Sequence, residues 1–275
     1  MEAINFFNSG MEKINLHDFN GAIIDFTKAI EIAPNFAEAY CNRGVARSFF
    51  EDYDGANNDF TITININPRL AMAYYNRGTN RDKLEDYEGA IDDFSKAIEI
   101  NPFSEEFFTS RGNSKLALLD YKEAIEDHTK AIQINPNFYL AYYNRGIAQE
   151  KLNDFKSAIE DYSSSIDINP DFTFAYINRG NVKGSLNDYS GAIEDYTKVI
   201  EIDPNYAEAY YDRGIDKFNL KDYHGAIEDF SAALKISPDD DEYYMKRELA
   251  KTALHQKDSF SVGEFVFRPN KNNNN

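Results

Sequence analysis

The chain has 275 residues, a net charge of −18 and 42% hydrophobic residues, a composition typical of a folded protein rather than a disordered one. The acidic balance argues against a nucleic-acid partner, because affinity for a phosphate backbone depends on Lys and Arg. The single cysteine, Cys41, excludes an internal disulfide, and no apolar run is long enough to span a bilayer, so we expect a cytoplasmic protein with no membrane partner.

One short phrase recurs along the chain at a fixed period. It reads AYYNRG at residues 73–78 and 141–146, with near copies at 39–44, 175–180 and 209–214. Glycine, proline and alanine positions keep the same 34-residue step through seven copies, without insertion or deletion. Such regular self-similarity indicates a solenoid. The copies span residues 3–36, 37–70, 71–104, 105–138, 139–172, 173–206 and 207–240.

Each copy is predicted to form two helices. In the third copy the first helix is expected from about Ala71 to Leu84. The second, YEGAIDDFSKAIEI, follows Asp86, whose carboxylate can cap the free amides of that helix, and Pro102 ends it. An aspartate holds the same N-cap position in every copy: Asp18, Asp52, Asp86, Asp120, Asp154, Asp188 and Asp222.

This pattern resembles the tetratricopeptide repeat, a 34-residue helix–turn–helix unit with spaced aromatic, Gly, Ala and Pro positions. The resemblance covers residues 3–240 in seven in-register copies. It implies an all-α fold, a right-handed superhelical solenoid of antiparallel helix pairs. Its concave groove would be lined mainly by the first helix of each pair.

The chain departs from the family pattern by placing Arg directly before the Gly of the repeated phrase. Every copy also carries an Asp directly before the aromatic residue of its second helix. The first copy has Ser9 in the Arg position, and Arg247 follows the last copy, so the two sets match if each Asp pairs with the next copy's Arg. We therefore predict structural ion pairs between repeats, with an anion-binding arginine stripe as the less favoured alternative. The predicted pairs are Asp25 with Arg43, Asp59 with Arg77, Asp93 with Arg111, Asp127 with Arg145, Asp161 with Arg179, Asp195 with Arg213, and Asp229 with Arg247.

The position two residues before the Gly tends to face the groove in this family. Five copies place Asn there, and a primary amide can bond both the N–H and the C=O of a bound peptide. An ordinary habit of the repeat is the competing explanation for these amides. With neighbouring tyrosines as apolar anchors, the predicted peptide-binding residues are Asn8, Asn42, Asn76, Asn144, Asn178, Tyr75, Tyr143 and Tyr211.

The sequence after the last repeat predicts one more helix and a tail. Residues 241–256 are expected to form a C-terminal capping helix, and residues 257–275 a flexible, Asn-rich tail. No catalytic, cofactor-binding or metal-ligand pattern is present, so we expect neither an enzyme nor a bound cofactor. The leading hypothesis is a scaffold that binds an extended, neutral-to-basic segment of another protein. The alternative is an architectural protein that forms a homo-oligomer through its N-terminal repeat or its tail.

Overall fold

The computed structural model describes residues 1–266, and these residues form α-helices joined by short connections. The chain divides into two compact units, Met1–Asn153 and Asp154–Asn275. Residues 267–275, the end of the predicted tail, lie outside the described residues.

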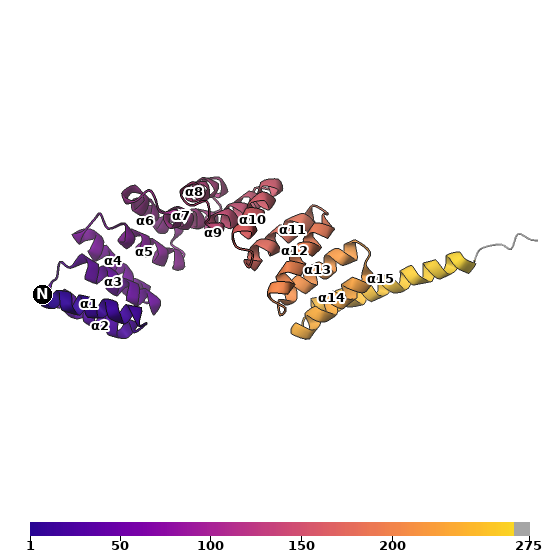
Figure 1. The fold of residues 1–275 in the computed structure, drawn as a ribbon, viewed down its shortest axis with the longest axis horizontal. Helices are drawn as coiled ribbons and strands as arrows, with labels where there is room; N and C mark the ends of the chain where they lie inside the picture. Colours follow the sequence, from indigo (N-terminus) through magenta and orange to yellow (C-terminus); the bar gives the residue numbers. More distant parts are fainter. Residues whose placement is uncertain (267–275) are drawn as a thin grey trace, which may run out of the picture. The chain divides into compact units, whose positions relative to one another are not determined.

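Within each unit, two consecutive helices of one repeat, such as α5 and α6 or α11 and α12, form an antiparallel pair (Figure 1). The first unit contains α1 (Glu2–Asn15), α2 (Phe19–Ile32), α3 (Ala37–Phe49), α4 (Tyr53–Ile66), α5 (Ala71–Lys83), α6 (Tyr87–Ile100), α7 (Glu105–Ala117), α8 (Tyr121–Ile134) and α9 (Tyr139–Lys151). The second contains α10 (Phe155–Ile168), α11 (Thr173–Ser185), α12 (Tyr189–Ile202), α13 (Ala207–Asn219), α14 (Tyr223–Ile236) and α15 (Asp241–Val266). Odd-numbered helices from α1 to α13 are the first helices of the repeats, and even-numbered helices are the second.

The two helices of a repeat approach closely because a glycine faces an aromatic ring. A Cβ atom added to Gly78 on α5 would lie only 2.9 Å from Cε1 of Phe94 on α6. Phe94 is 1% exposed, and the neighbouring Ala90 and Ala97 are fully buried on the same helix. Small residues therefore let these two backbones approach, and the ring of Phe94 fills the space between them.

The predicted aspartate N-caps form in six of the seven repeats. Asp86, for example, accepts a hydrogen bond from the backbone N–H of Gly89 at 3.1 Å. Asp120 makes no such bond, and there the third helical residue is Glu123 instead of glycine. A Cβ at Gly89 would lie 2.3 Å from the Asp86 carboxylate, so a side chain at this position interferes with the cap. In the fifth repeat Ser157 holds the position, and its cap bond is longer, at 3.3 Å.

Each turn between the helices of a repeat contains one residue with a positive φ, and in this chain it is never glycine. This left-handed conformation ends the first helix and is easiest for glycine and asparagine. Leu119 adopts it with φ of 65°, and it is an unfavourable residue for the role. The residues concerned are His17, Glu51, Glu85, Leu119, Asn153, Asn187 and Lys221.

The C-terminal helix is longer than predicted. It was expected to end at residue 256 and to give way to a flexible tail, but α15 continues to Val266. No proline interrupts the chain between Pro238 and Pro269, so nothing in this stretch forces the helix to stop. The predicted tail boundary at residue 257 is therefore wrong.

Candidate functional site

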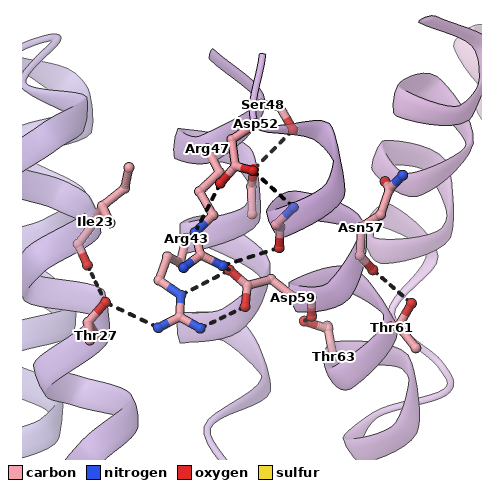
Figure 2. Close-up of polar contacts among 12 residues, drawn as sticks. Ile23, Thr27, Arg43, Arg47, Ser48, Asp52, Asn57, Asp59, Thr61 and Thr63 are labelled. Carbon is pink, nitrogen blue, oxygen red and sulfur yellow. Dashed lines mark hydrogen bonds and ion pairs between the residues drawn. The ribbon is translucent and has the colours of Figure 1, made fainter. Parts of the chain in front are cut away.

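The repeated arginine and aspartate meet within a repeat. Arg43 on α3 donates two parallel hydrogen bonds to Asp59 on α4, Nε to Oδ2 at 2.9 Å and Nη2 to Oδ1 at 2.7 Å (Figure 2). One turn after Arg43, Arg47 donates a third bond to the same carboxylate at 2.9 Å. Asp59 is completely buried, so the two cations replace the water it loses on folding.

The predicted pairing between repeats is therefore wrong. Four further repeats show the same fork within the repeat: Arg77 with Asp93, Arg111 with Asp127, Arg179 with Asp195, and Arg213 with Asp229. The aspartate of the first repeat and the arginine after the last repeat, whose positions suggested pairing between repeats, each have a polar partner close by. Asp25 accepts bonds from Lys13 and Ser9, both at 2.6 Å, and Arg247 lies 3.4 Å from the neighbouring Glu248.

The glycine–aromatic contact explains the correct register. Arg77 directly precedes Gly78, and Asp93 directly precedes Phe94. Because Gly78 and Phe94 are in contact, the residues before them also come together. The sequence contained this signal, together with a second cation four residues after the first. That second cation is Arg47, Arg81, Lys115, Lys183 or Lys217, each bonded to the aspartate of its own repeat, and Lys13 holds the same position in the first repeat, where Ser9 replaces the arginine.

A hydroxyl group, rather than a carboxylate, links the arginine of a repeat to the preceding repeat in six places. Nη1 of Arg43 donates to Oγ1 of Thr27 on α2 at 3.1 Å, and Thr27 donates to the carbonyl of Ile23 (Figure 2). The same bond joins Arg77 to Thr61, Arg111 to Ser95, Arg145 to Thr129, Arg179 to Ser163 and Arg213 to Thr197. Because these arginines bond aspartate and hydroxyl groups within the protein, they are structural residues and do not form a free stripe for anionic ligands.

The predicted amide residues occupy equivalent positions on the first helices, and their surroundings differ. Asn8 is exposed on α1, whereas Asn42 is half-buried and donates to the carbonyl of Glu38 in its own helix at 2.7 Å. Asn76 is half-buried on α5 and bonds the Cys41 thiol of the preceding repeat. Burial and the negative Glu38 nevertheless raise the pKa of Cys41 to about 11. Asn144 and Asn178 are half-buried on α9 and α11.

Two of the predicted tyrosines connect consecutive repeats. The Tyr75 ring lies 4.9 Å from that of Phe107 on α7, and its hydroxyl accepts a bond from Ser110 at 3.5 Å. The Tyr211 ring stacks on Tyr243 of α15 at 4.8 Å. Both rings are half-buried, as is Tyr143 on α9. Tyr75 and Tyr211 therefore contribute to packing whether or not they also touch a ligand.

A small cavity lies between α3 and α5 beside one predicted amide. Its volume is about 120 Å³, and its walls include Asn76 and Thr79 of α5 together with Val45 and the buried ring of Phe60. Asn80 on the same face donates to the Ser48 hydroxyl at 2.8 Å. The cavity thus combines an apolar floor with an amide at its edge, which is the arrangement that a side chain and backbone of a peptide require.

Sequence reasoning missed two acidic residues on α13. Asp212 takes the place of the amide in the seventh repeat and is half-buried, and Asp216, one turn later, is 5% exposed. Burial, with the charges of Glu208, Asp216 and Glu242, raises the pKa of Asp212 to about 7. Burial also raises the pKa of Asp216 to about 6. The departure from Asn at position 212 was the available signal.

Comparison with known families agrees with the helix pairs and their period. Models of the tetratricopeptide repeat match residues 4–36, 71–104, 139–172 and 207–240, and a model described as TPR repeat matches residues 112–153 and 180–215. The chain belongs to the tetratricopeptide repeat family. Members of this family are protein-interaction scaffolds and generally lack catalytic activity.

Solved structures share the fold at low sequence identity. A crystal structure of MamA protein is 26% identical, with a TM-score of 0.57 over 61% of this chain and 92% of that one. The C-terminal part of a repeat protein from Cytophaga hutchinsonii is 16% identical, with a TM-score of 0.74 over 87% of this chain and 98% of that one. YrrB, described as a TPR protein with an unusual peptide-binding site, is 24% identical, with a TM-score of 0.57 over 67% of this chain and 95% of that one.

A search of curated protein sequences found no match. Within residues 1–266, no helix has the length and apolar character needed to cross a bilayer.

Proposed function

We propose that this tetratricopeptide repeat protein is a non-enzymatic scaffold that binds an extended, neutral-to-basic segment of another protein along its first helices. The observation that carries the proposal is the cavity beside Asn76, where an amide borders an apolar floor formed by Phe60 and Val45. The net charge of −18 favours a neutral or basic partner.

Magnitudes indicate that the amides cannot bind a segment alone. Each hydrogen bond contributes about 0.5–1.5 kcal/mol net, whereas association costs roughly 4–15 kcal/mol. Apolar side chains of the partner must therefore enter sites such as the cavity beside Asn76. We expect modest affinity and little dependence on sequence apart from a preference for apolar and basic residues.

A random-peptide selection on the full chain tests this proposal. Peptides selected on the parent protein should lose binding to a variant with Asn76→Ala, Asn144→Ala and Asn178→Ala. Asn58→Ala, which changes an exposed amide on the second helix α4, is the matched control and should retain binding. Selected peptides that bind all three proteins equally would refute a role for the amides.

A second candidate function is self-association through the array ends. Exposed apolar side chains favour it: Ile4 on α1 is 54% exposed, and Tyr244, Met245 and Leu249 on α15 are 53%, 62% and 51% exposed. Sedimentation of the full chain tests this candidate directly. An oligomer that dissociates in an Ile4→Ser or Met245→Ser variant would support self-association, and a monomer at all concentrations would exclude it.

A further inference from the structure

A cavity lies between the seventh repeat and the start of α15. Its volume is about 500 Å³, and it is bounded by the connection before α13, the first turn of that helix, the end of α14 and the start of α15. We refer to it as the terminal cavity. Two tyrosines, two carboxylates and a hydroxyl group are among its lining residues: Tyr206, Tyr243, Glu208, Asp240 and Ser237. Within residues 1–266, no lysine, arginine or histidine lines it, so its negative charge has no positive group beside it.

A change of residue type directly before α15 accounts for the terminal cavity. At earlier repeats this position is apolar, and Phe36 and Phe138 pack there against buried core residues. Asp240 holds the position before α15, and its Oδ1 accepts hydrogen bonds from the backbone N–H groups of Glu242 and Tyr243 at 2.9 and 3.1 Å. The short carboxylate caps the helix and does not fill the space that an aromatic ring fills elsewhere.

Contacts within the protein position the walls of the terminal cavity. Glu208 accepts a hydrogen bond from the Tyr206 hydroxyl at 3.3 Å. Tyr243 is 8% exposed, and its ring stacks on Tyr211 with the centroids 4.8 Å apart. Burial, together with the negative charges of Asp240 and Glu208, raises the pKa of Tyr243, so both carboxylates act on this ring. The cavity therefore places two negative charges beside a fixed aromatic surface.

The same unit shows what such a set of groups binds. Arg213 lies over the ring of Tyr210, with its Cζ atom 5.6 Å from the ring centroid. It also donates two hydrogen bonds to Asp229 and one to the hydroxyl of Thr197. A ring, a carboxylate and a hydroxyl group are thus the surroundings in which this chain holds its own arginine. A guanidinium group suits them because it stacks on aromatic faces and bonds carboxylates through a planar fork.

We propose that the terminal cavity binds an arginine side chain of another protein. The guanidinium group would stack on one of the two tyrosines and donate hydrogen bonds to Asp240 and Glu208. A lysine ammonium matches the cavity less well, because it has no planar group to stack on a ring. The site is separate from the cavity beside Asn76, which belongs to the other unit, so either site can bind without the other.

An NMR titration of the full chain with N-acetyl-argininamide tests the proposal. The chemical shifts of the backbone amides of Ala207 and Tyr243 should change and reach saturation. We expect a dissociation constant on the order of 1 mM, because a single side chain supplies few contacts. N-acetyl-citrullinamide has nearly the same shape without the positive charge, and it should bind about tenfold more weakly.

Neutral substitutions separate the site from the general acidity of the chain. Glu208→Gln combined with Asp240→Asn removes both charges, and asparagine still caps a helix. This double variant should bind N-acetyl-argininamide about tenfold more weakly than the parent. The matched control is Glu38→Gln combined with Glu228→Gln, which removes the same charge at exposed positions and should retain the parent affinity. Glu38 holds the position in the second repeat that Glu208 holds in the seventh.

A third variant fills the terminal cavity. Asp240→Phe introduces the residue that Phe172 supplies directly before α11, and its ring should abolish the saturable shifts. Three results would overturn the proposal: shifts that spread over the acidic surface without saturating, equal binding of the arginine and citrulline probes, or parent affinity in the neutral double variant.

Discussion

Arg77 binds Asp93 of its own repeat through two parallel hydrogen bonds, Nε to Oδ2 at 2.9 Å and Nη2 to Oδ1 at 2.7 Å. Arg81 adds a third bond to this carboxylate at 2.9 Å, and Asp93 is only 3% exposed. Two cations thus surround one buried anion at the contact between two helices. Removing the anion should cost more than removing an ordinary surface charge.

Asp93→Ala tests this cluster. We expect a loss of about 3–5 kcal/mol in the free energy of unfolding, because Arg77 and Arg81 would be left without their carboxylate. Asp92→Ala, at an exposed neighbouring position on the same helix, should change the free energy by less than about 0.5 kcal/mol. Urea denaturation of both variants provides the comparison, and equal losses would refute the role of the cluster.

A second prediction concerns the buried side chain of His128. It fills the aromatic position of the fourth repeat, is completely buried, and has no hydrogen-bond partner at either ring nitrogen. His128→Phe, the residue used at Phe60 and Phe94, should raise the free energy of unfolding by about 1–3 kcal/mol. His224→Phe, at an exposed position on α14, should give no such gain in the same urea measurement.

The same histidine predicts a loss of stability in acid. Burial lowers the pKa of His128 to about 4, although the adjacent Asp127 acts in the opposite direction. The unfolded chain therefore takes up a proton before the folded chain does. This contribution to stability is fully present above pH 6.5 and is lost as the pH falls toward 4. Urea titrations at pH 7.5 and 5 should show a smaller acid loss in His128→Phe than in the parent.

The turn residues with positive φ offer a stabilising substitution. Leu119→Gly should raise the free energy of unfolding by about 0.5–1 kcal/mol, because glycine adopts a φ of 65° without steric cost. Asn187→Gly is the matched control and should be nearly neutral, since asparagine tolerates this conformation. Thermal melting of the two variants measures the difference, and an equal gain at both positions would contradict the explanation.

The N-cap aspartates should contribute unequally to the free energy of unfolding, according to whether each one accepts a cap hydrogen bond. Asp86→Ala is expected to cost about 0.5–2 kcal/mol, because the N–H of Gly89 loses its acceptor. Asp120→Ala should cost less, since its side chain accepts no bond at the start of α8. Comparing the two urea midpoints decides the matter. A larger loss for Asp120→Ala would show that the cap bond is not what stabilises these helix starts.

Local sequence signals predicted the helices of this protein well. The second helix expected after Asp86 spans Tyr87–Ile100 as predicted. The N-cap Asp86, the apolar period and Pro102 all indicate the same helix bounds. The end of α15 was missed because no comparable stop signal exists between residues 256 and 266. The fold class was predicted from the 34-residue period, which is apparent only when several copies of the repeat are compared.

The side-chain pairing was harder to predict, for a physical reason. Counting charges along the chain gave Asp59 to Arg77, whereas the structure joins Arg43 to Asp59. Charge counts carry no information on which helix faces are in contact. That information lies in the glycine that permits close approach, as Gly44 does opposite Phe60. The raised pKa of Asp212 was missed because its main cause is burial, which residue type alone does not reveal.

Because the cations and the aspartate belong to the same repeat, a repeat imposes no charge requirement on its neighbours. Deleting residues 71–104 would remove Asp93 together with both of its cations. It would also place the Thr61 hydroxyl where it meets Arg111 in place of Arg77. Gene duplication or loss can therefore lengthen or shorten the array by whole repeats without stranding a buried ion. The third and fifth repeats already carry the identical phrase AYYNRG, at residues 73–78 and 141–146.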